Sequence, residues 1–206
     1  MIALVDYGAG NLTSVRKAFA ALAAPVFTPE SPAALSTASG IVVPGVGHFG
    51  ATSALGPEWV RAIRASVEAG RPLLGICLGM QWLFEGSDEA PECAGLGVLA
   101  GRCRRLAGVD ESGAMLKVPH VGWNDLAIAR EDSIVADVEP GSQVYFTHSF
   151  VAPVTNDTVA VTRHGEPFAA IVQRRRVAGV QFHPEKSGDV GLQILRNWIR
   201  SLTANA

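Results

Sequence analysis

The chain has 206 residues, of which 48% are hydrophobic, and its 17 basic and 19 acidic side chains give a formal net charge of −2. This length suits a single domain over residues 1–206 with a sizeable core, and the balanced charge argues against a nucleic-acid-binding protein. No uncharged apolar run reaches membrane-spanning length, and the first residues lack the cationic region of a signal peptide. Three cysteines, Cys77, Cys93 and Cys103, show no disulfide spacing, so we expect a cytoplasmic protein.

The first half of the sequence alternates short apolar runs with helical patterns, and Asn11 or Thr13 is placed to cap the first helix. The predicted elements are, in chain order, a strand at 2–7, a helix after residue 11, a strand at 40–43, a helix at 58–69, a strand at 72–76 and a helix opening at 80–84. Strand, loop and helix repeated in this order predict parallel strands with right-handed crossovers.

The second half carries fewer helical patterns. Short strands are predicted near 97–106, 125–128, 143–147, 158–163, 168–173 and 177–182, and a closing helix at 190–202. We therefore predict an α/β fold with a central, mostly parallel sheet flanked by helices, and an antiparallel elaboration in the second half. The basic run 173–176 lies between two predicted strands, which favours a solvated hairpin turn over a nucleic-acid contact.

Cys77 is the candidate nucleophile. Residues 73–81 read LLGICLGMQ, so the cysteine lies between two glycines where a buried strand turns into a helix, the pattern of a nucleophile elbow. Gly75 and Gly79 permit the sharp turn, the helix N-terminus favours thiolate, and the Leu78 amide points toward the same space. A lone cysteine would more often be a buried structural residue, as we expect for Cys93 and Cys103.

A second loop follows the neighbouring strand. Pro44-Gly45-Val46-Gly47 would leave backbone N–H groups able to point at an anion at the same edge of the sheet. The alternative is an ordinary tight turn. Because the Cys77 elbow lies at that edge, the loop is predicted to supply an oxyanion hole.

The stretch GVQFHPEKSG places His183 two residues before Glu185 at the end of a predicted strand. Side chains at i and i+2 of a strand share a side, so the glutamate would fix the tautomer of the imidazole that serves Cys77. A structural pair and a metal site formed with His120 and His148 are alternatives, but no metal-ligand spacing supports the second. Without a phosphate loop, no nucleotide cofactor is expected.

At this point the sequence resembles the class I (triad) glutamine amidotransferases, which implies a flavodoxin-like fold. The matching motifs are Pro44-Gly45-Val46-Gly47, Gly75-Ile-Cys77-Leu-Gly79-Met-Gln81 and Gln181-Phe-His183-Pro-Glu185-Lys186-Ser187. Three further segments, Met1 to Leu12, Pro119-His-Val-Gly-Trp123-Asn124 and Tyr145-Phe-Thr-His148-Ser149-Phe150, resemble the glutaminase subunits of imidazole glycerol phosphate synthase, of histidine biosynthesis. The resemblance covers essentially the whole chain.

The resemblance implies roles for individual residues. Cys77 would attack the side-chain amide of glutamine, His183 would carry the proton to ammonia and Glu185 would hold His183. The amides of Val46, Gly47 and Leu78 would form the oxyanion hole. The glutamine-binding residues would be Gly45, Gln81, Glu89, Ser149 and Phe150, the last of which is often tyrosine in the family. His48 lies where a smaller residue is common in the family, and the sequence offers no physical reason for it.

The resemblance also implies a partner, a (β/α)8-barrel cyclase subunit. It would use the ammonia to convert a phosphoribulosyl formimino aminoimidazole carboxamide nucleotide to imidazole glycerol phosphate and an aminoimidazole carboxamide ribotide. His120, Trp123, Tyr145 and Lys186 match positions near the interface and ammonia gate. We expect the isolated chain to be a poor glutaminase, because its 45–47 peptides would not all face the oxyanion.

Three alternatives stay open on the residues. Another triad glutaminase, for GMP, anthranilate or pyridoxal phosphate synthesis, would share Cys77, His183 and Glu185, but residues 119–124 and 186–187 argue against it. A cysteine peptidase or related thiol hydrolase would need no barrel partner. A non-enzymatic subunit would be expected to have lost a triad member.

Overall fold

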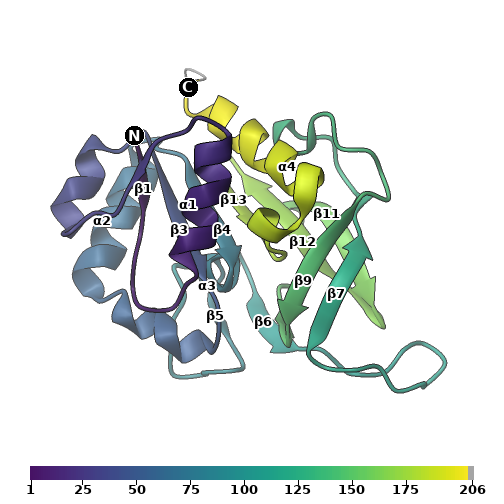
Figure 1. Ribbon diagram of the computed structural model, residues 1–206. Helices are drawn as coiled ribbons and strands as arrows, with labels where there is room; N and C mark the ends of the chain where they lie inside the picture. Colours follow the sequence, from purple (N-terminus) through teal and green to yellow (C-terminus); the bar gives the residue numbers. More distant parts are fainter. Residues whose placement is uncertain (204–206) are drawn as a thin grey trace.

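A computed structural model describes residues 1–203 of the chain. Its centre is an eight-stranded sheet (Figure 1). The strand order is β2 (Val26–Phe27), β1 (Ile2–Leu4), β3 (Gly40–Gly45), β4 (Leu73–Cys77), β13 (Val177–Val180), β12 (Glu166–Arg174), β11 (Thr158–His164) and β8 (Ala127–Ile128). The strands from β2 to β13 pair in parallel, and β12, β11 and β8 join antiparallel. The predicted parallel half and antiparallel elaboration are thus confirmed.

Helices cover both faces of this sheet. The helices are α1 (Leu12–Ala21), α2 (Pro57–Glu68), α3 (Leu78–Leu83) and α4 (Gly188–Ser201), with short 3-10 turns η1 (Pro32–Thr37), η2 (Phe49–Ala54), η3 (Ser133–Val135) and η4 (Pro184–Lys186). Apolar residues of α1 and α4 join one core cluster, and those of α2 and α3 join the other. Strand residues alternate between the clusters, as in β3, where Val42 faces α1 and its neighbours Ile41 and Val43 face the opposite side.

Two smaller sheets lie beside the main one. One contains β10 (Phe150–Val151), β6 (Arg102–Arg105) and β5 (Gly86–Ser87), and the other is the antiparallel pair β7 (His120–Asp125) and β9 (Gln143–His148). Figure 1 shows β7 and β9 side by side, away from the parallel half. This pair and the ends of β3, β4 and β13 frame the site described below.

Several predicted boundaries were wrong. The strand expected at 97–106 covers only 102–105, and the one expected at 125–128 is two elements, β7 and β8. Glycines with positive φ at Gly97 and Gly101 break the first, and Leu126 separates β7 from β8. The 173–176 run does form a hairpin turn, with Arg175 at φ +54°. Asn11, rather than Thr13, caps α1 by accepting from the Ser14 N–H at 3.3 Å.

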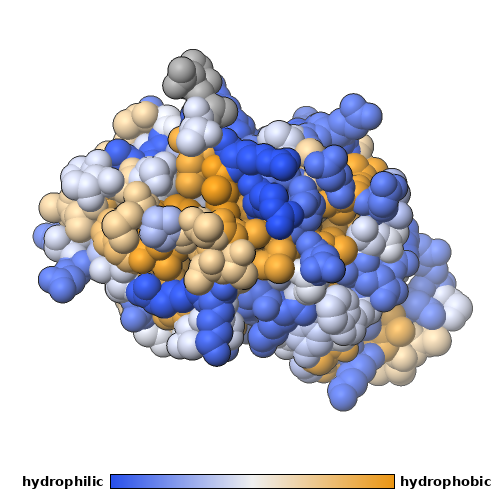
Figure 2. Space-filling view, turned by 45° about the horizontal axis from the view of Figure 1, so that its top comes forward, coloured by the Kyte–Doolittle hydropathy of each residue, from blue (hydrophilic) through white to orange (hydrophobic). Residues whose placement is uncertain are grey.

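The surface mixes apolar and hydrophilic residues. On the face shown in Figure 2, apolar patches are interrupted by hydrophilic residues. Across residues 1–203, no helix has both the length and the apolarity needed to cross a membrane.

Candidate active site

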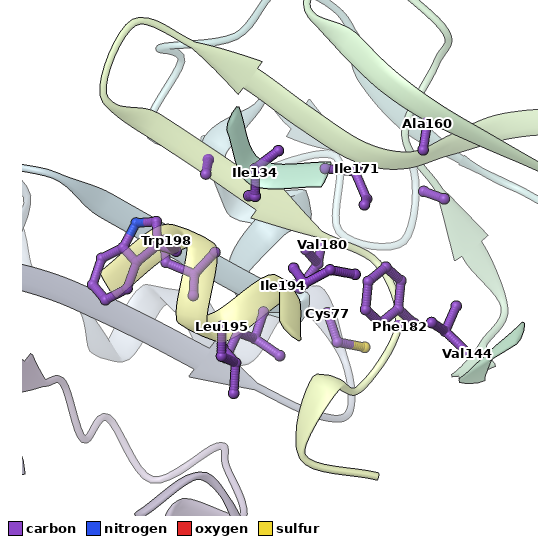
Figure 3. Packing of buried hydrophobic residues seen from close by; sticks show 14 of the residues in the cluster. Cys77, Ile134, Val144, Ala160, Ile171, Val180, Phe182, Ile194, Leu195 and Trp198 are labelled. Atoms are coloured by element: carbon purple, nitrogen blue, oxygen red, sulfur yellow. The ribbon is translucent and has the colours of Figure 1, made fainter. Parts of the chain in front are cut away.

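Cys77 lies where β4 turns into α3, as expected. Its backbone has φ +53° and ψ −107°, a conformation that costs a non-glycine residue free energy. The turn is possible because positions 75 and 79 are glycines. A Cβ on Gly79 would lie 1.8 Å from the Val43 carbonyl oxygen, and one on Gly75 would lie 2.6 Å from the Gly79 oxygen. Only glycines allow this close approach of β3, β4 and α3. Figure 3 shows the Cys77 sulfur at the margin of the core, beside Phe182.

The sulfur borders a cavity of about 320 Å³, large enough for a small polar substrate. Its lining residues are Gly47, Cys77, Leu78, Gln81, Glu89, Pro119, Thr147, His148, Ser149 and Phe150. The structure thus brings the elbow, part of the 44–47 loop and four of the five predicted glutamine-binding residues to one cavity. Gly45 lies just outside it, at the end of β3 opposite Cys77 in the β3–β4 register.

His183 and Glu185 form a close pair. His183 Nδ1 lies 2.8 Å from Glu185 Oε1, and both side chains are only 3% exposed. The prediction that His183 and Glu185 share one side of a strand was wrong, because β13 ends at Val180 and Glu185 lies in the 3-10 turn η4. Pro184, with its fixed φ, begins that turn, and the turn brings the Glu185 carboxylate to Nδ1 of the imidazole.

The charge of His183 follows from these neighbours. Burial alone would lower the pKa of His183, but the nearby Cys77 and Glu185 raise it to about 9. His183 Nε2 makes no formed hydrogen bond to any residue in 1–203, which leaves it available to the Cys77 side chain, the largest contributor to the raised pKa. The raised pKa means that imidazolium stabilises the fold fully below pH 6.5, an effect lost as pH rises through about 9.

Two buried glutamines connect Cys77 to the wall of the cavity. Gln181 Nε2 lies 3.7 Å from the Cys77 sulfur, and Gln181 Oε1 accepts from Gln81 Nε2 at 3.1 Å. Gln81 Nε2 also donates to the Phe150 carbonyl at 2.9 Å, so both of its hydrogens are used and only its oxygen is left for a ligand. Sequence reasoning gave Gln181 no role. Its signal was an amide side chain within an otherwise apolar buried strand run.

The 44–47 loop does not present all its amides to the cavity. The Val46 N–H donates to the Ala9 carbonyl at 2.9 Å, on the β1–α1 loop, and the Val46 side chain is exposed. Gly47 has φ +94° and lines the cavity. The peptide between Gly45 and Val46 therefore faces away from Cys77 in this state.

Glu89 lines the cavity. Its Oε2 accepts from the Phe49 N–H at 2.7 Å, which leaves the other carboxylate oxygen for a cationic group. His48 accepts from the Gly50 N–H and caps η2, so its side chain has a local structural function. Cys93 is partly exposed, whereas Cys103 is buried in the core.

Three of the predicted gate residues meet on an exposed face. The Trp123 and Tyr145 rings pack edge to face with centroids 6.1 Å apart, and Lys186 Nζ lies 5.8 Å from the Tyr145 centroid. Trp123 is 55% exposed. The Tyr145 carbonyl accepts from the His183 N–H at 2.9 Å, which links this face directly to the His183–Glu185 turn.

His120 is different, because its side chain is buried. His148 Nδ1 lies 3.1 Å from the Phe150 carbonyl, so it must donate there. His148 Nε2 then accepts from His120 Nδ1 at 3.2 Å, and His120 Nε2 accepts from Asn124 Nδ2 at 3.2 Å. This histidine chain requires both rings to be neutral. Burial first, and then neighbouring histidines, lower the pKa of His120 to about 4 and of His148 to about 3. The sequence analysis did not predict this hydrogen-bonded series of histidines.

A metal-binding arrangement is absent from the described part of the chain, where His, Cys, Asp and Glu side chains form no suitable group of three. The chemistry available is that of a thiol beside an imidazole held by a carboxylate. Such a group attacks acyl carbons when a backbone oxyanion hole can form.

Comparison with known proteins agrees with this class of site. Residues 3–202 match the glutamine amidotransferase class-I family, to which the chain belongs. Solved relatives share the fold. A crystal structure of a glutamine amidotransferase superposes with a TM-score of 0.76 over 99% of this chain and 100% of that one, at 20% identity. The PurLQS structure from Thermotoga maritima superposes with a TM-score of 0.69 over 98% of each chain, at 19% identity.

Within the class, the curated relatives are more specific. The HisH protein of imidazole glycerol phosphate synthase from Halalkalibacterium halodurans is 45% identical over 96% of this chain and 94% of its own length. The Geobacillus kaustophilus HisH is 46% identical over 97% and 96%, and that of Bacillus subtilis is 44% identical over 97% and 96%. The chain is thus a member of the HisH group of glutamine amidotransferases.

Proposed function

We propose that this chain hydrolyses glutamine to glutamate and ammonia at Cys77 and passes the ammonia to a cyclase subunit of imidazole glycerol phosphate synthase, in histidine biosynthesis. The observation that carries the proposal is a buried His183–Glu185 pair near enough to Cys77 for that cysteine to raise the pKa of His183, while Cys77 itself lies on a glycine elbow and lines a cavity suited to a small polar substrate.

The reaction follows from the protonation states. The reaction begins when the Cys77 thiol passes its proton to His183, a transfer that the raised pKa of His183 favours. The thiolate attacks the side-chain amide carbon of glutamine and forms a C–S bond. Collapse of the tetrahedral oxyanion breaks the C–N bond, and His183 Nε2 gives its proton to the leaving ammonia. Neutral His183 then takes a proton from water, which attacks the thioester and releases glutamate and thiolate.

Binding of glutamine is assigned to the cavity wall. The free carboxylate oxygen of Glu89 suits the substrate α-ammonium group, and the Gln81 oxygen suits an N–H donor. Gly45, Ser149 and Phe150 would act mainly through backbone groups. Position 150 carries no phenol hydroxyl here, so any contact made by it relies on the backbone and the ring.

The oxyanion hole would be completed by a backbone change. The Leu78 amide begins α3 beside the sulfur, whereas the Val46 N–H is held by Ala9 at 2.9 Å. Turning the Gly45–Val46 peptide would bring that N–H to the oxyanion, with Gly47 adjoining it. The flanking glycines make this change inexpensive. The isolated chain is accordingly expected to hydrolyse glutamine slowly.

The receiving subunit is proposed to be a (β/α)8 barrel that docks on the face around Trp123, Tyr145 and Lys186. Ammonia released at Cys77 would leave past Tyr145, whose carbonyl already contacts the His183 backbone. His120 lies behind this face and would act by supporting β7 and β9. A barrel docked here would shield the ammonia from water.

One experiment tests the proposal. Glutamate release is measured for wild type and Cys77→Ala, each with and without the cyclase and its nucleotide. We expect release only from wild type, raised strongly by partner and nucleotide, while Cys77→Ala complexes still make product from added ammonium. Retained glutaminase activity in Cys77→Ala would disprove the mechanism. Full activity of the isolated wild-type chain would disprove the claim that its Gly45–Val46 peptide must turn before the oxyanion hole is complete.

A further inference from the structure

Gln181 is a fully buried glutamine to which the proposed reaction gives no role. It directly follows β13, and its backbone N–H donates to the Ala170 carbonyl at 2.9 Å, which fixes the backbone at this position. Its side-chain Nε2 donates to the Cys77 sulfur across 3.7 Å. A buried amide costs free energy unless its hydrogen bonds are made, so an apolar side chain would be the simpler choice here unless the sulfur needs a donor.

The direction of this hydrogen bond is set by the neighbouring groups. The Phe150 carbonyl can only accept, so the Gln81 side chain must present its nitrogen to that carbonyl, at 2.9 Å. The same nitrogen lies 3.1 Å from the Gln181 side chain, which must therefore present its oxygen there. The Gln181 nitrogen is left facing Cys77. Reversing either amide would place two donors or two acceptors together, so the network itself directs a donor at the sulfur.

A donor at this place matters most when the sulfur is charged. A neutral thiol is a weak acceptor, whereas a hydrogen bond to an ionised group is about twice as strong as one between neutral groups. The Gln181 amide does not titrate, so it can donate throughout the reaction. His183, by contrast, gives its proton to the leaving ammonia in the proposed reaction and is neutral while the thioester exists.

We infer that Gln181 is a further catalytic residue, whose side-chain N–H stabilises the Cys77 thiolate. When the thiol passes its proton to His183, the Gln181 hydrogen bond strengthens and favours the transfer. The bond weakens when the sulfur forms the C–S bond and loses its charge, and it strengthens again when the thioester C–S bond breaks and thiolate leaves. No further proton moves, because the amide keeps both of its hydrogens. This inference rests on the proposed function and deepens it.

The first test needs neither glutamine nor the cyclase. Gln181→Met keeps the length of the side chain and removes the donor. The purified chain is treated with iodoacetamide, and mass spectrometry follows alkylation of Cys77, with the partly exposed Cys93 as the reference in each sample. At pH 7 the Cys77 rate should fall about ten- to a hundredfold relative to wild type, with the Cys93 rate unchanged. The difference should shrink toward pH 10, where an ordinary thiol is ionised without help.

Gln193→Met is the matched control. This glutamine on α4 also donates from its side chain, to Asn197 Oδ1 at 3.0 Å, but it does not line the cavity at Cys77. The same substitution there should leave the pH profile of Cys77 alkylation unchanged. In the complex with the cyclase and its nucleotide, Gln181→Met should lower kcat for glutamine about ten- to a hundredfold, with KM within about threefold of wild type. Turnover on added ammonium should be unchanged.

Two results would overturn the inference. One is a Cys77 alkylation rate in Gln181→Met within twofold of wild type at pH 7, and the other is a rate lowered equally at every pH, which would mark a structural role. If Gln181→Met does not fold, NMR of the Gln181 side-chain amide in wild type and Cys77→Ala decides instead. One amide proton should shift when the sulfur is removed, and two unmoved protons would overturn the inference. The alkylation result does not depend on glutaminase activity, whereas glutamate release by Cys77→Ala would refute the proposed function itself.

Discussion

The two walls of the cavity at Cys77 are held by different forces. On the side of β3, β4 and α3, backbone lies against backbone, and Gly79 approaches the Val43 carbonyl more closely than any side chain would allow. On the side of β9 and β10, a chain of side-chain hydrogen bonds runs from Phe150 through His148 and His120 to Asn124. The first wall depends on sterics and is insensitive to pH. The second depends on neutral histidines and should weaken in acid.

The steric wall predicts the largest effect. Gly79→Ala places a Cβ 1.8 Å from the Val43 oxygen, so backbone must move, and we expect a loss of more than about 4 kcal/mol of unfolding free energy or no folded protein. Gly56→Ala is the matched control, since a Cβ there meets nothing within 4 Å, and it should cost at most about 1 kcal/mol. Denaturant unfolding measures both. Equal effects would show that close backbone contact does not hold this wall.

The His183–Glu185 turn joins the two walls, because it follows β13 and contacts β9. Glu185→Gln keeps the shape but removes the charge that orients and protonates His183. We expect kcat for glutamine in the complex to fall by about 10²–10⁴, with ammonium-driven turnover retained. The control is Glu139→Gln, an exposed carboxylate, which should leave both activities unchanged. A Glu185→Gln complex with wild-type glutamine turnover would remove Glu185 from the mechanism.

The hydrogen-bonded wall predicts a pH effect. The lowered pKa values of His120 and His148 mean that the fold keeps both rings neutral where the unfolded chain would protonate them. This stability is present above pH 6.5 and is lost as pH falls toward about 4. Between pH 7 and pH 5 we expect unfolding free energy to drop by about 2–4 kcal/mol. Equilibrium urea unfolding at the two pH values measures the drop.

His120→Gln should flatten this pH dependence, whereas His48→Gln, at an exposed position, should leave it unchanged. If both variants kept the full pH slope, the histidine chain would not be its source. His164 stacks on His120 with ring centroids 4.3 Å apart, and His183 is coupled to His148, so both groups also face the histidine chain.

The smallest predicted effect concerns backbone strain, which is needed for function at Cys77 but not at Arg175. Cys77 and Arg175 both have positive φ, near +53° and +54°. Arg175→Gly in the β12–β13 turn should stabilise the chain by about 0.5–1 kcal/mol and leave activity intact. Cys77→Gly should also relieve strain but abolish glutamine turnover. Thermal unfolding with parallel activity assays checks both, and a destabilised Arg175→Gly would contradict the strain argument.

This difference between the walls also explains what could be predicted from the sequence. The glycines on either side of Cys77 are required by close backbone contact, so their spacing made the elbow and the parallel order of its strands predictable. The histidine chain was not, because His120 and His148 meet only through the pairing of β7 with β9, in which they stand opposite each other. The family motifs identified His183 and Glu185, while the strand geometry assigned to them was wrong because Pro184 starts a 3-10 turn.

The orientation of the peptides in the 44–47 loop could not be predicted from the sequence either. Its sequence allows the Gly45–Val46 peptide to face either way, since glycines flank Val46 and neither orientation is sterically excluded. Only the structure shows the Val46 N–H bonded to Ala9.

The most direct test of the central claim is covalent. The complex with the cyclase and its nucleotide is mixed with glutamine, quenched in acid during turnover, digested and analysed by mass spectrometry for a γ-glutamyl thioester. Cys93 and Cys103 serve as internal controls, because both are free thiols outside the cavity lining. We predict the glutamyl group on Cys77 alone, and a glutamyl group on either other cysteine, or turnover without any adduct at Cys77, would contradict the account.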